Sequence, residues 1–235
     1  MNAAMISYQY QANQGHHVSF GVEATLGAST KPIVFVLDED ASLLESAELL
    51  VRREGWHAET FASEEEFLAR PRAAVPSCLV LGICLPEFDG LALQKRLAAE
   101  RSDMPIIFIA GHTDVPTTVQ AMKAGAVEFL VKPFREAALS NSMREALERS
   151  RVTLGCQAEI QSLRARYSAL SRREREVMTL VASGFLNKQV GGELGISEIT
   201  VKAHRGQVMQ KMKANSLAEL VRMSTRLGLA AVSPS

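Results

Sequence analysis

The sequence has little cysteine, no long apolar run and no net charge. Three cysteines among 235 residues are too few for a disulfide framework, and they fit a reducing compartment. No apolar run approaches the roughly 18 residues that a membrane-spanning helix requires. The N-terminus shows no basic patch followed by an apolar core, so a signal peptide is not expected. These absences predict a cytoplasmic protein without membrane segments.

The zero net charge conceals a difference between the two parts of the chain. Residues 31–150 hold 13 Lys and Arg against 19 Asp and Glu, whereas residues 167–235 hold 10 against 5. An acidic module joined to a basic one suggests that only the C-terminal part approaches a polyanion. Small domains often differ by a few charges, so this asymmetry favours nucleic acid only slightly.

Five strand-like runs alternate with helical patterns between residues 31 and 149. The first, "IVFVL" at 33–37, is continuously apolar and β-branched, which is typical of a strand buried on both faces. The others are "HAETF" (57–61), "CLVLGI" (78–83), "PIIFIA" (105–110) and "VEFLV" (127–131). Strands that alternate with helices predict an α/β domain with a doubly wound, five-stranded parallel sheet. Residues 1–30 show no sustained period and are predicted to be a disordered extension.

The C-terminal part is helical throughout. Residues 150–166 read as a helical linker, and residues 167–235 as an all-α domain of four helices, at 171–183, 187–195, 197–213 and 216–228. Ser171 followed by Glu174 has the spacing of a capping box. Gly195 supplies a tight turn and Ser197 a second cap, so the segment predicts a helix-turn-helix.

Polar residues gather where the predicted strands end. Asp38, Glu39 and Asp40 follow the first strand, and Lys132 follows the fifth. In an open parallel sheet these ends meet at one edge, where functional groups collect. Carboxylates opposite a lysine suit a divalent cation and a phosphoryl group. For Asp40 alone, a helix cap is the better interpretation.

Residues 31–149 resemble the receiver domain of bacterial response regulators. The resemblance is carried by "VLDED", "LPEFDGLAL", "FIAGHTDV" and "AVEFLVKPF", and the chain as a whole is similar to FixJ/NarL-type regulators. In that family an aspartate of the third strand accepts phosphate from a histidine kinase, and an acidic pair holds magnesium. A hydroxyl residue after the fourth strand moves toward the phosphate, which a lysine contacts.

The resemblance assigns a role to four positions and shows losses at two others. Asp38 and Glu39 match the acidic pair, Lys132 the lysine, and Phe129 the movable aromatic residue. Gly82 occupies the acceptor position and Ala110 the hydroxyl position. Glycine cannot form an acyl phosphate and alanine cannot hydrogen-bond one.

The phosphoryl chemistry is therefore predicted to be lost while its host fold remains. We expect no cofactor, with any metal binding at Asp38 and Glu39 weak or absent and magnesium doubtful. Asp89 is the alternative acceptor, although it lies in "PEFDG", where a turn favours aspartate. Cys84 is a candidate redox replacement, but a free cysteine beside a strand end is more often part of the core.

Residues 167–230 resemble the LuxR-type helix-turn-helix. The motifs "SRREREV", "NKQV", "LGISEITVKAHRGQVMQKM" and "SLAELVR" occur in the family order. The resemblance implies binding to double-stranded DNA through Lys188, Thr200, Lys202, His204, Arg205 and Lys211. It also implies a homodimer formed by the last helix, around Leu217, Leu220 and Val221, and a contact with RNA polymerase.

The sequence therefore predicts a DNA-binding transcriptional regulator with a degenerate receiver. Its control would pass to protein abundance, a small ligand or a partner protein at the receiver. One alternative restores phosphorylation at Asp89, and another makes the protein an interaction module that pairs with and titrates another regulator. An enzyme is not expected, because no nucleophile–base pair is apparent.

Overall fold

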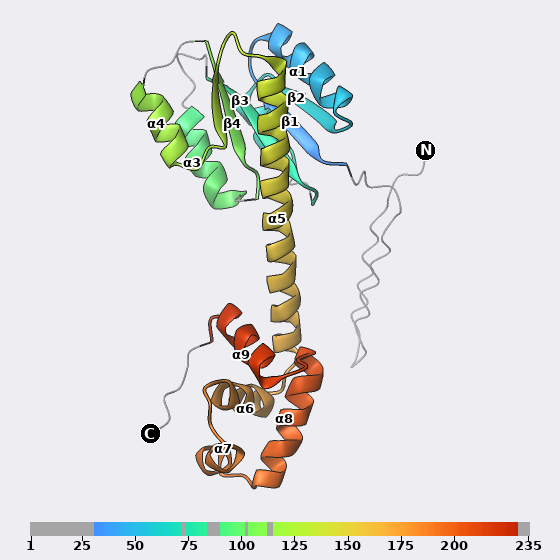
Figure 1. Ribbon diagram of the computed structural model, residues 1–235, viewed down its shortest axis with the longest axis vertical. Coiled ribbons are helices and arrows are strands. Elements are labelled where there is room, and N and C mark those ends of the chain that lie inside the picture. Colours follow the sequence, from blue (N-terminus) through green and yellow to red (C-terminus); the bar gives the residue numbers. More distant parts are fainter. Residues whose placement is uncertain (1–30, 72–73, 84–89, 102, 112–114, 230–235) are drawn as a thin grey trace, which may run out of the picture.

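The computed structural model describes residues 31–71, 74–83, 90–101, 103–111 and 115–229. The predicted extension at residues 1–30 lies outside the described residues, as do Cys84 and Asp89. The described chain forms an α/β domain and a helical domain joined by one long helix, α5 (Figure 1). No helix in these ranges is long and apolar enough to span a bilayer.

The N-terminal domain confirms the predicted parallel sheet. Its strands are arranged in the order β2-β1-β3-β4-β5, and all neighbouring pairs are parallel. The bounds are β1 (Ile33–Leu37), β2 (His57–Phe61), β3 (Ser77–Ile83), β4 (Ile106–Ala110) and β5 (Glu128–Val131). Each begins within one residue of its predicted start. The strands β1, β3 and β4 are almost wholly buried apolar runs, which mark their positions clearly, whereas β2 and β5 are more exposed.

Helices cover both faces of this sheet. They are α1 (Ala41–Arg53), α2 (Glu64–Ala69), α3 (Gly90–Glu100), α4 (Val115–Lys123) and α5 (Glu136–Ser168). Side chains from alternating positions of β1 divide between two cores: Val34 belongs to the core that includes residues of α1 and α5, and Phe35 to the core that includes residues of α2, α3 and α4. This alternation is the period of two expected of a strand buried on both faces.

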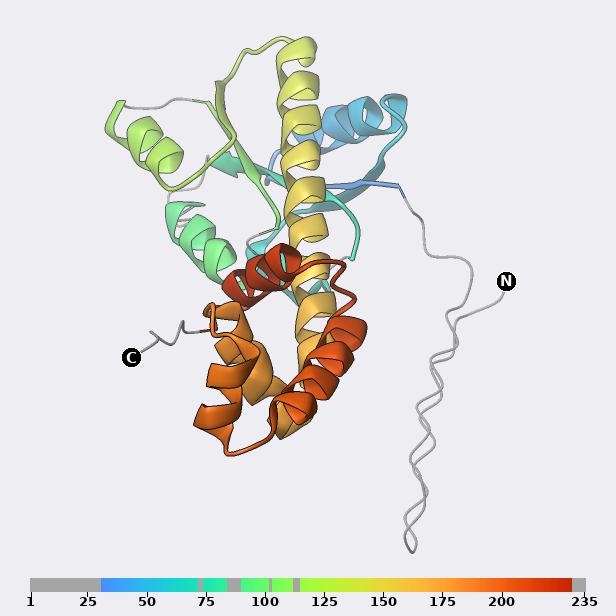
Figure 2. The ribbon, with the colours of Figure 1, turned by 60° about the horizontal axis from the view of Figure 1, so that its bottom comes forward.

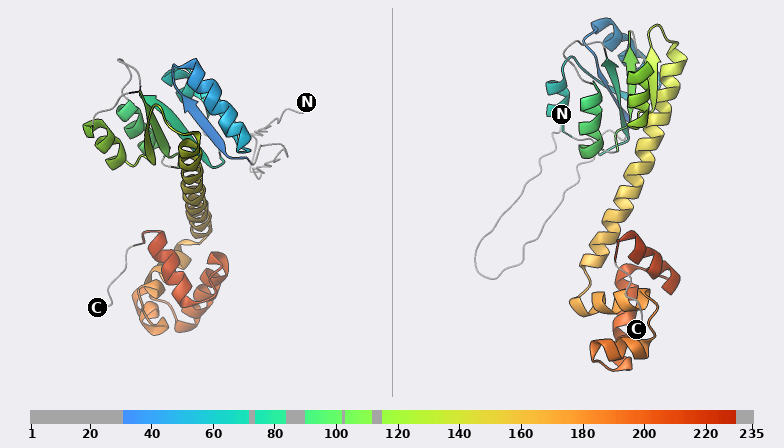
Figure 3. Two further views of the ribbon diagram at one scale, coloured as in Figure 1. Left: turned by 45° about the horizontal axis from the view of Figure 1, so that its top comes forward. Right: turned by 90° about the vertical axis from the view of Figure 1, so that its left-hand side faces the viewer.

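Helix α5 joins the last receiver helix and the predicted helical linker into one helix. It continues without a break through Gly155 and includes the whole predicted linker, residues 150–166. Figure 3 shows it leaving the sheet and running into the C-terminal helices. The same helix therefore contributes Met143 to the receiver core and Leu163 to the C-terminal core.

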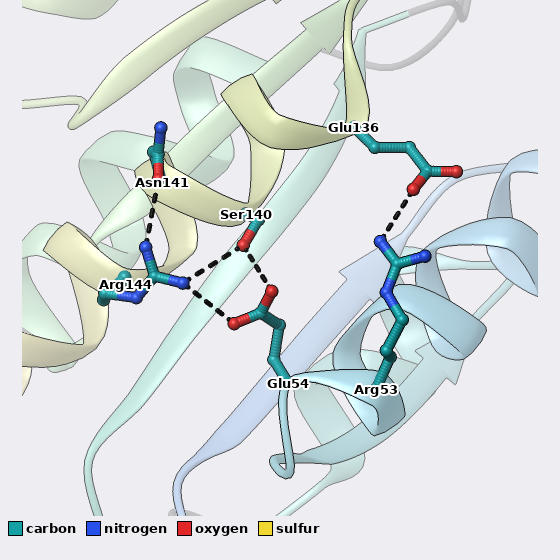
Figure 4. A network of polar contacts seen from close by, with 6 residues as sticks. All are labelled: Arg53, Glu54, Glu136, Ser140, Asn141 and Arg144. Atoms are coloured by element: carbon teal, nitrogen blue, oxygen red, sulfur yellow. Dashed lines mark hydrogen bonds and ion pairs between the residues drawn. The ribbon is translucent and has the colours of Figure 1, made fainter.

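A polar network fixes α5 against the end of α1 (Figure 4). Glu54 accepts hydrogen bonds from Ser140 Oγ at 2.8 Å and from Arg144 at 2.9 Å. These contacts, the Ser140 hydrogen bond first, hold the pKa of the Glu54 carboxyl below its usual range. Arg53 forms an ion pair with Glu136 at 2.7 Å. The first half of α5 is thus tied to the receiver at several points.

The C-terminal domain has a core of its own. Its helices are α6 (Arg172–Ala182), α7 (Asn187–Leu194), α8 (Glu198–Met212) and α9 (Leu217–Arg226), each within two residues of its predicted range (Figure 2). The buried residues of this core all lie between Leu163 and Leu220. Since no receiver residue contributes to it, a fragment that begins just before Leu163 contains the complete core.

Candidate functional site

Strand register brings the predicted receiver residues to one edge. Leu37 pairs with Leu81, and Ile83 pairs with Ala110. Asp38, the next residue after β1, therefore lies beside Gly82. Ala110 also pairs with Val131, and its carbonyl oxygen accepts the backbone N–H of Lys132 at 2.8 Å.

The Asp38 carboxylate occupies the space beside Gly82. A Cβ on Gly82 would lie only 1.8 Å from Asp38 Oδ2. Asp38 is 5% exposed, and its Oδ1 accepts the backbone N–H of Asp40 at 2.8 Å. Its Oδ2 is buried and has no hydrogen-bond partner among the described residues. The missing acceptor has thus left no empty pocket, because a neighbouring acid fills its position.

Asp40 has two roles at this edge. It caps α1, as predicted, by accepting backbone N–H groups of Ser42 and Leu43. Its Oδ2 also accepts a hydrogen bond from Lys132 Nζ at 3.2 Å. This bond is the main reason that the pKa of Asp40 lies below its usual value. Lys132 therefore engages the cap residue, while Glu39 of the predicted acidic pair is exposed.

The two predicted switch positions are packed into the receiver. Ala110 is 1% exposed at the end of β4, where it presents only a methyl group. Phe129 is partly buried, and its ring centroid lies 5.9 Å from that of Phe108. An aromatic pair at this separation is favourable. The ring therefore lies against the core rather than in solvent.

The described residues do not fit the family's magnesium site. Such a site needs several oxygen ligands converging on one point. Here Glu39 is exposed, Asp40 is engaged by Lys132, and position 82 supplies no side-chain oxygen. Across the parts of the chain that the structure describes, no three His, Cys, Asp or Glu side chains are grouped to hold a metal ion. No phosphoryl step through magnesium follows from this geometry.

The C-terminal helices are bounded by the predicted caps and turn. Ser171 and Glu174 form both hydrogen bonds of a capping box, and Ser197 Oγ accepts the backbone N–H of Thr200. Gly195 ends α7 with a φ of 64°, in the left-handed region that favours glycine. Gly195 and Ser197 form the tight connection between α7 and α8, and the capping box starts α6.

The two glycines of α7 have different surroundings. A Cβ on Gly191 would lie 2.8 Å from the carbonyl oxygen of Ile196, whereas a Cβ on Gly192 would meet nothing within 4 Å. Gly191 thus permits the close turn into α8. Gly192 has no such contact, and its flexibility weakens the helix.

We expect Gly192→Ala to raise the free energy of unfolding of a 158–235 fragment by about 1 kcal/mol, the difference in helix propensity. Gly191→Ala is the matched control. It should lower the free energy of unfolding, because the added methyl group would displace the Ile196 carbonyl oxygen. Urea unfolding followed by circular dichroism measures both. Equal effects of the two substitutions would contradict the close approach at Gly191.

The structure divides the predicted DNA-contacting set. Lys188, Thr200 and Lys202 are exposed on α7 and α8, and Lys202 forms only an exposed ion pair with Glu198. His204 and Arg205 are partly buried, and Arg205 donates a hydrogen bond to Asn187. Thr200 and Lys202 lie near the start of α8, the end of a recognition helix that approaches base edges, whereas Lys188 lies near the start of α7.

Lys211 is placed in an intradomain contact. Its Nζ lies 2.7 and 2.9 Å from the two carboxylate oxygens of Glu174, a residue that is 5% exposed. This ion pair is the first cause of the lowered pKa of Glu174. Lys211 thus neutralises a buried carboxylate, and a phosphate contact would have to break that pair.

An exposed apolar residue was missing from the prediction. Ile199, in the first turn of α8, is 80% exposed. Its position outside the buried series Val201, Val208 and Met212 is the sequence signal that could have revealed it. An apolar side chain at the start of a recognition helix can contact a thymine methyl group.

Helix α9 presents only part of the predicted dimer set. Leu217 and Val221 are 39% and 36% exposed, whereas Leu220 is fully buried in the core. Leu220 therefore supports the domain from inside and cannot contact a second chain in this conformation. Of the predicted dimer set, only Leu217 and Val221 are exposed.

The sheet edge and the capped helices together define a two-domain protein: a receiver fold followed by a DNA-binding helix-turn-helix. Comparison with known proteins agrees. The model described as "Response regulator receiver domain" matches residues 34–144, and that described as "Bacterial regulatory proteins, luxR family" matches residues 168–224.

Several relatives match along most of their length. "Nodulation protein W" of Bradyrhizobium diazoefficiens is 49% identical over 87% of this chain and 90% of its own. "Transcriptional regulatory protein FixJ" of the same organism is 38% identical over 86% and 98%. The solved structure entitled "Low Resolution Structure of Response Regulator StyR" matches with a TM-score of 0.74 and 42% identity, covering 83% of this chain and 99% of that one.

The chain therefore belongs to the response regulators that join a receiver to a LuxR-type DNA-binding domain. This family consists of transcriptional regulators, which in general are not enzymes, and DNA is the partner that its C-terminal domain binds.

Proposed function

We propose that this protein is a transcriptional regulator that binds DNA without phosphorylation of its receiver. The observation that carries the proposal is the Asp38 carboxylate lying where a side chain of residue 82 would stand. An acceptor is missing from the sequence, and the remaining space is filled by a buried acid. Lys132, which contacts phosphate in the family, is engaged by Asp40.

The exposed start of α8 supports DNA binding by the unmodified chain. Lys202 and Thr200 lie in solvent beside Ile199, and none of them is buried by the receiver. Lysine side chains hold phosphates, whereas base edges are read by neighbouring groups. We therefore assign phosphate contacts to Lys188, Lys202 and Arg205, and base contacts to Thr200 and Ile199.

Homodimerisation through α9 is part of the proposal. Leu217 and Val221 form a small exposed apolar pair on that helix. Two copies joined there would present two α8 helices to DNA, and the two-fold symmetry of the protein would be mirrored in the site. Contact with RNA polymerase and control by a ligand or partner protein at the receiver also belong to the proposal.

A second candidate function, pairing with another regulator, has one observation in its favour. Val115, Val119 and Met122 are exposed on α4, and Val131 is exposed on the neighbouring strand β5. An apolar surface of this kind suits a protein partner. In that function DNA binding would be secondary, so the unmodified chain would bind no DNA site by itself.

Footprinting of the full chain on genomic fragments, with no phosphodonor present, separates these functions. We expect protected sites with inverted-repeat character, since a dimer contacts two half-sites. Protection of a single unsymmetrical half-site at saturating protein would exclude a dimer on DNA. Absence of any specific site would favour the interaction module.

A further inference from the structure

A cavity of about 280 Å³ lies at the other end of the receiver from Asp38. Its wall combines the ends of α3 and α4, the start of β4 and the part of α5 that leaves the sheet. The lining residues are Gln94, Ala98, Arg101, Met104, Pro105, Ile106, Ala124, Gly125, Arg149 and Thr153. Its volume is close to the lower end of the range for small-molecule sites.

The charged groups in the wall are both cationic. Among the residues that the structure describes, Arg101 and Arg149 line the cavity and no Asp or Glu does. Arg101 is held in place because it donates to the carbonyl oxygen of Arg70 at 2.8 Å and lies over the Phe67 ring. Arg149 forms an exposed ion pair with Glu145 within α5. Such exposed pairs contribute little stability, so Arg149 can turn to another anion.

The rest of the wall is mainly apolar, and a buried hydrogen bond links the two helices that form part of it. Met104 and Ile106 are buried at 5% exposure each, and they lie beside Pro105 and Ala98. Gln94, 2% exposed, donates a hydrogen bond from Nε2 to the carbonyl oxygen of Ala121 at 3.0 Å. This bond joins α3 to α4 and fixes their separation.

We propose that this cavity binds a small organic carboxylate with a short apolar chain. The carboxylate would pair with Arg149 and Arg101, and the chain would pack on Met104, Pro105 and Ile106. Arg149 and Thr153 belong to α5, whereas the other lining residues belong to the receiver. A bound ligand would therefore join the receiver to the helix that continues into the DNA-binding domain. That regulatory consequence rests on the proposed function, but the binding does not.

The test uses the full-length, isotope-labelled chain in nuclear magnetic resonance titrations with sodium pentanoate. We expect saturable shifts of the amide signals of Gly125 and Thr153. Neutral 1-pentanol and inorganic phosphate are matched probes, which lack the charge and the apolar chain respectively. Both should shift these signals at least fivefold more weakly. Equal shifts with phosphate would show only adventitious anion binding, and no saturable shift with pentanoate would exclude the site.

Two pairs of variants locate the binding. Ala98→Leu fills the mouth of the cavity and should abolish the shifts, whereas Ala99→Leu, an exposed neighbour on α3 outside the lining, should leave them unchanged. Arg149→Ala should weaken binding at least fivefold, and Arg151→Ala, an exposed arginine of α5 in a similar ion pair, should not. Equal behaviour within either pair would overturn the proposal. These titrations do not measure DNA affinity, so a result that excludes ligand binding in the cavity would leave the proposed function intact.

Discussion

Gly82→Ala should unfold at a lower urea concentration than the parent chain. The added methyl group would lie 1.8 Å from Asp38 Oδ2 and 2.5 Å from its Cγ, so the buried carboxylate must move. Overpacking of this kind costs about 1–3 kcal/mol. The single tryptophan, Trp56, packs against the receiver core, and its fluorescence reports the unfolding of that domain.

Asp38→Ala provides the control for this prediction. It removes both atoms in the clash and leaves a Cβ that would lie 3.1 Å from the new methyl group. Gly82→Ala should therefore cost much less when Asp38 is already alanine, which makes the two changes non-additive. Additive effects would contradict the placement of Asp38 over Gly82. The same displacement must precede any gain of phosphorylation in Gly82→Asp, because aspartate carries the same Cβ.

DNA affinity should fall steeply as the salt concentration rises. Lys188, Lys202 and Arg205 give three proposed phosphate contacts per chain, and so six per dimer, with a slope of log affinity against log salt of about −5. Between 50 and 200 mM salt, such a slope corresponds to a loss of about 10³-fold. Fluorescence anisotropy with a labelled operator fragment measures this dependence.

Two lysines of α8 should respond differently in the same assay. Lys202→Ala should weaken binding and make the slope shallower by about one per chain, since one phosphate contact is lost. Lys211→Ala should leave the slope unchanged and instead lower the free energy of unfolding by about 1–3 kcal/mol, because Glu174 would remain buried without its partner. A shallower dependence of log affinity on log salt for Lys211→Ala would show that Lys211 contacts DNA phosphate after all.

The fold was predictable because its signals are local. Apolar runs such as "IVFVL" placed the strands, and Ser171, Glu174 and Ser197 placed helix starts that the structure confirms. The helical linker at 150–166 was also predicted, but Gly155 left open whether it continues the receiver helix, and the structure shows one helix from Glu136 to Ser168.

The candidate sites were only partly predictable. The sequence showed that position 82 has no phosphate-accepting side chain. It could not show that the Asp38 carboxylate occupies the space of that side chain, because this depends on the conformation of Asp38. The family resemblance assigned Lys211 to DNA, whereas in the structure Glu174 lies close enough to form an ion pair with it. Leu220 was placed in the dimer set because the last helix resembles the dimer-forming helix of the family. An apolar residue of such a helix can equally be buried in the core of its own domain, as Leu220 is.

The central claim is that DNA binding does not depend on phosphorylation of the receiver. Its most direct test measures the operator affinity of the full chain before and after incubation with acetyl phosphate and magnesium, with intact mass recorded for each sample. We predict no stable phosphoryl adduct and affinities that agree within about twofold. A stable adduct together with a tenfold gain in affinity, about 1.4 kcal/mol of coupling, would contradict the account.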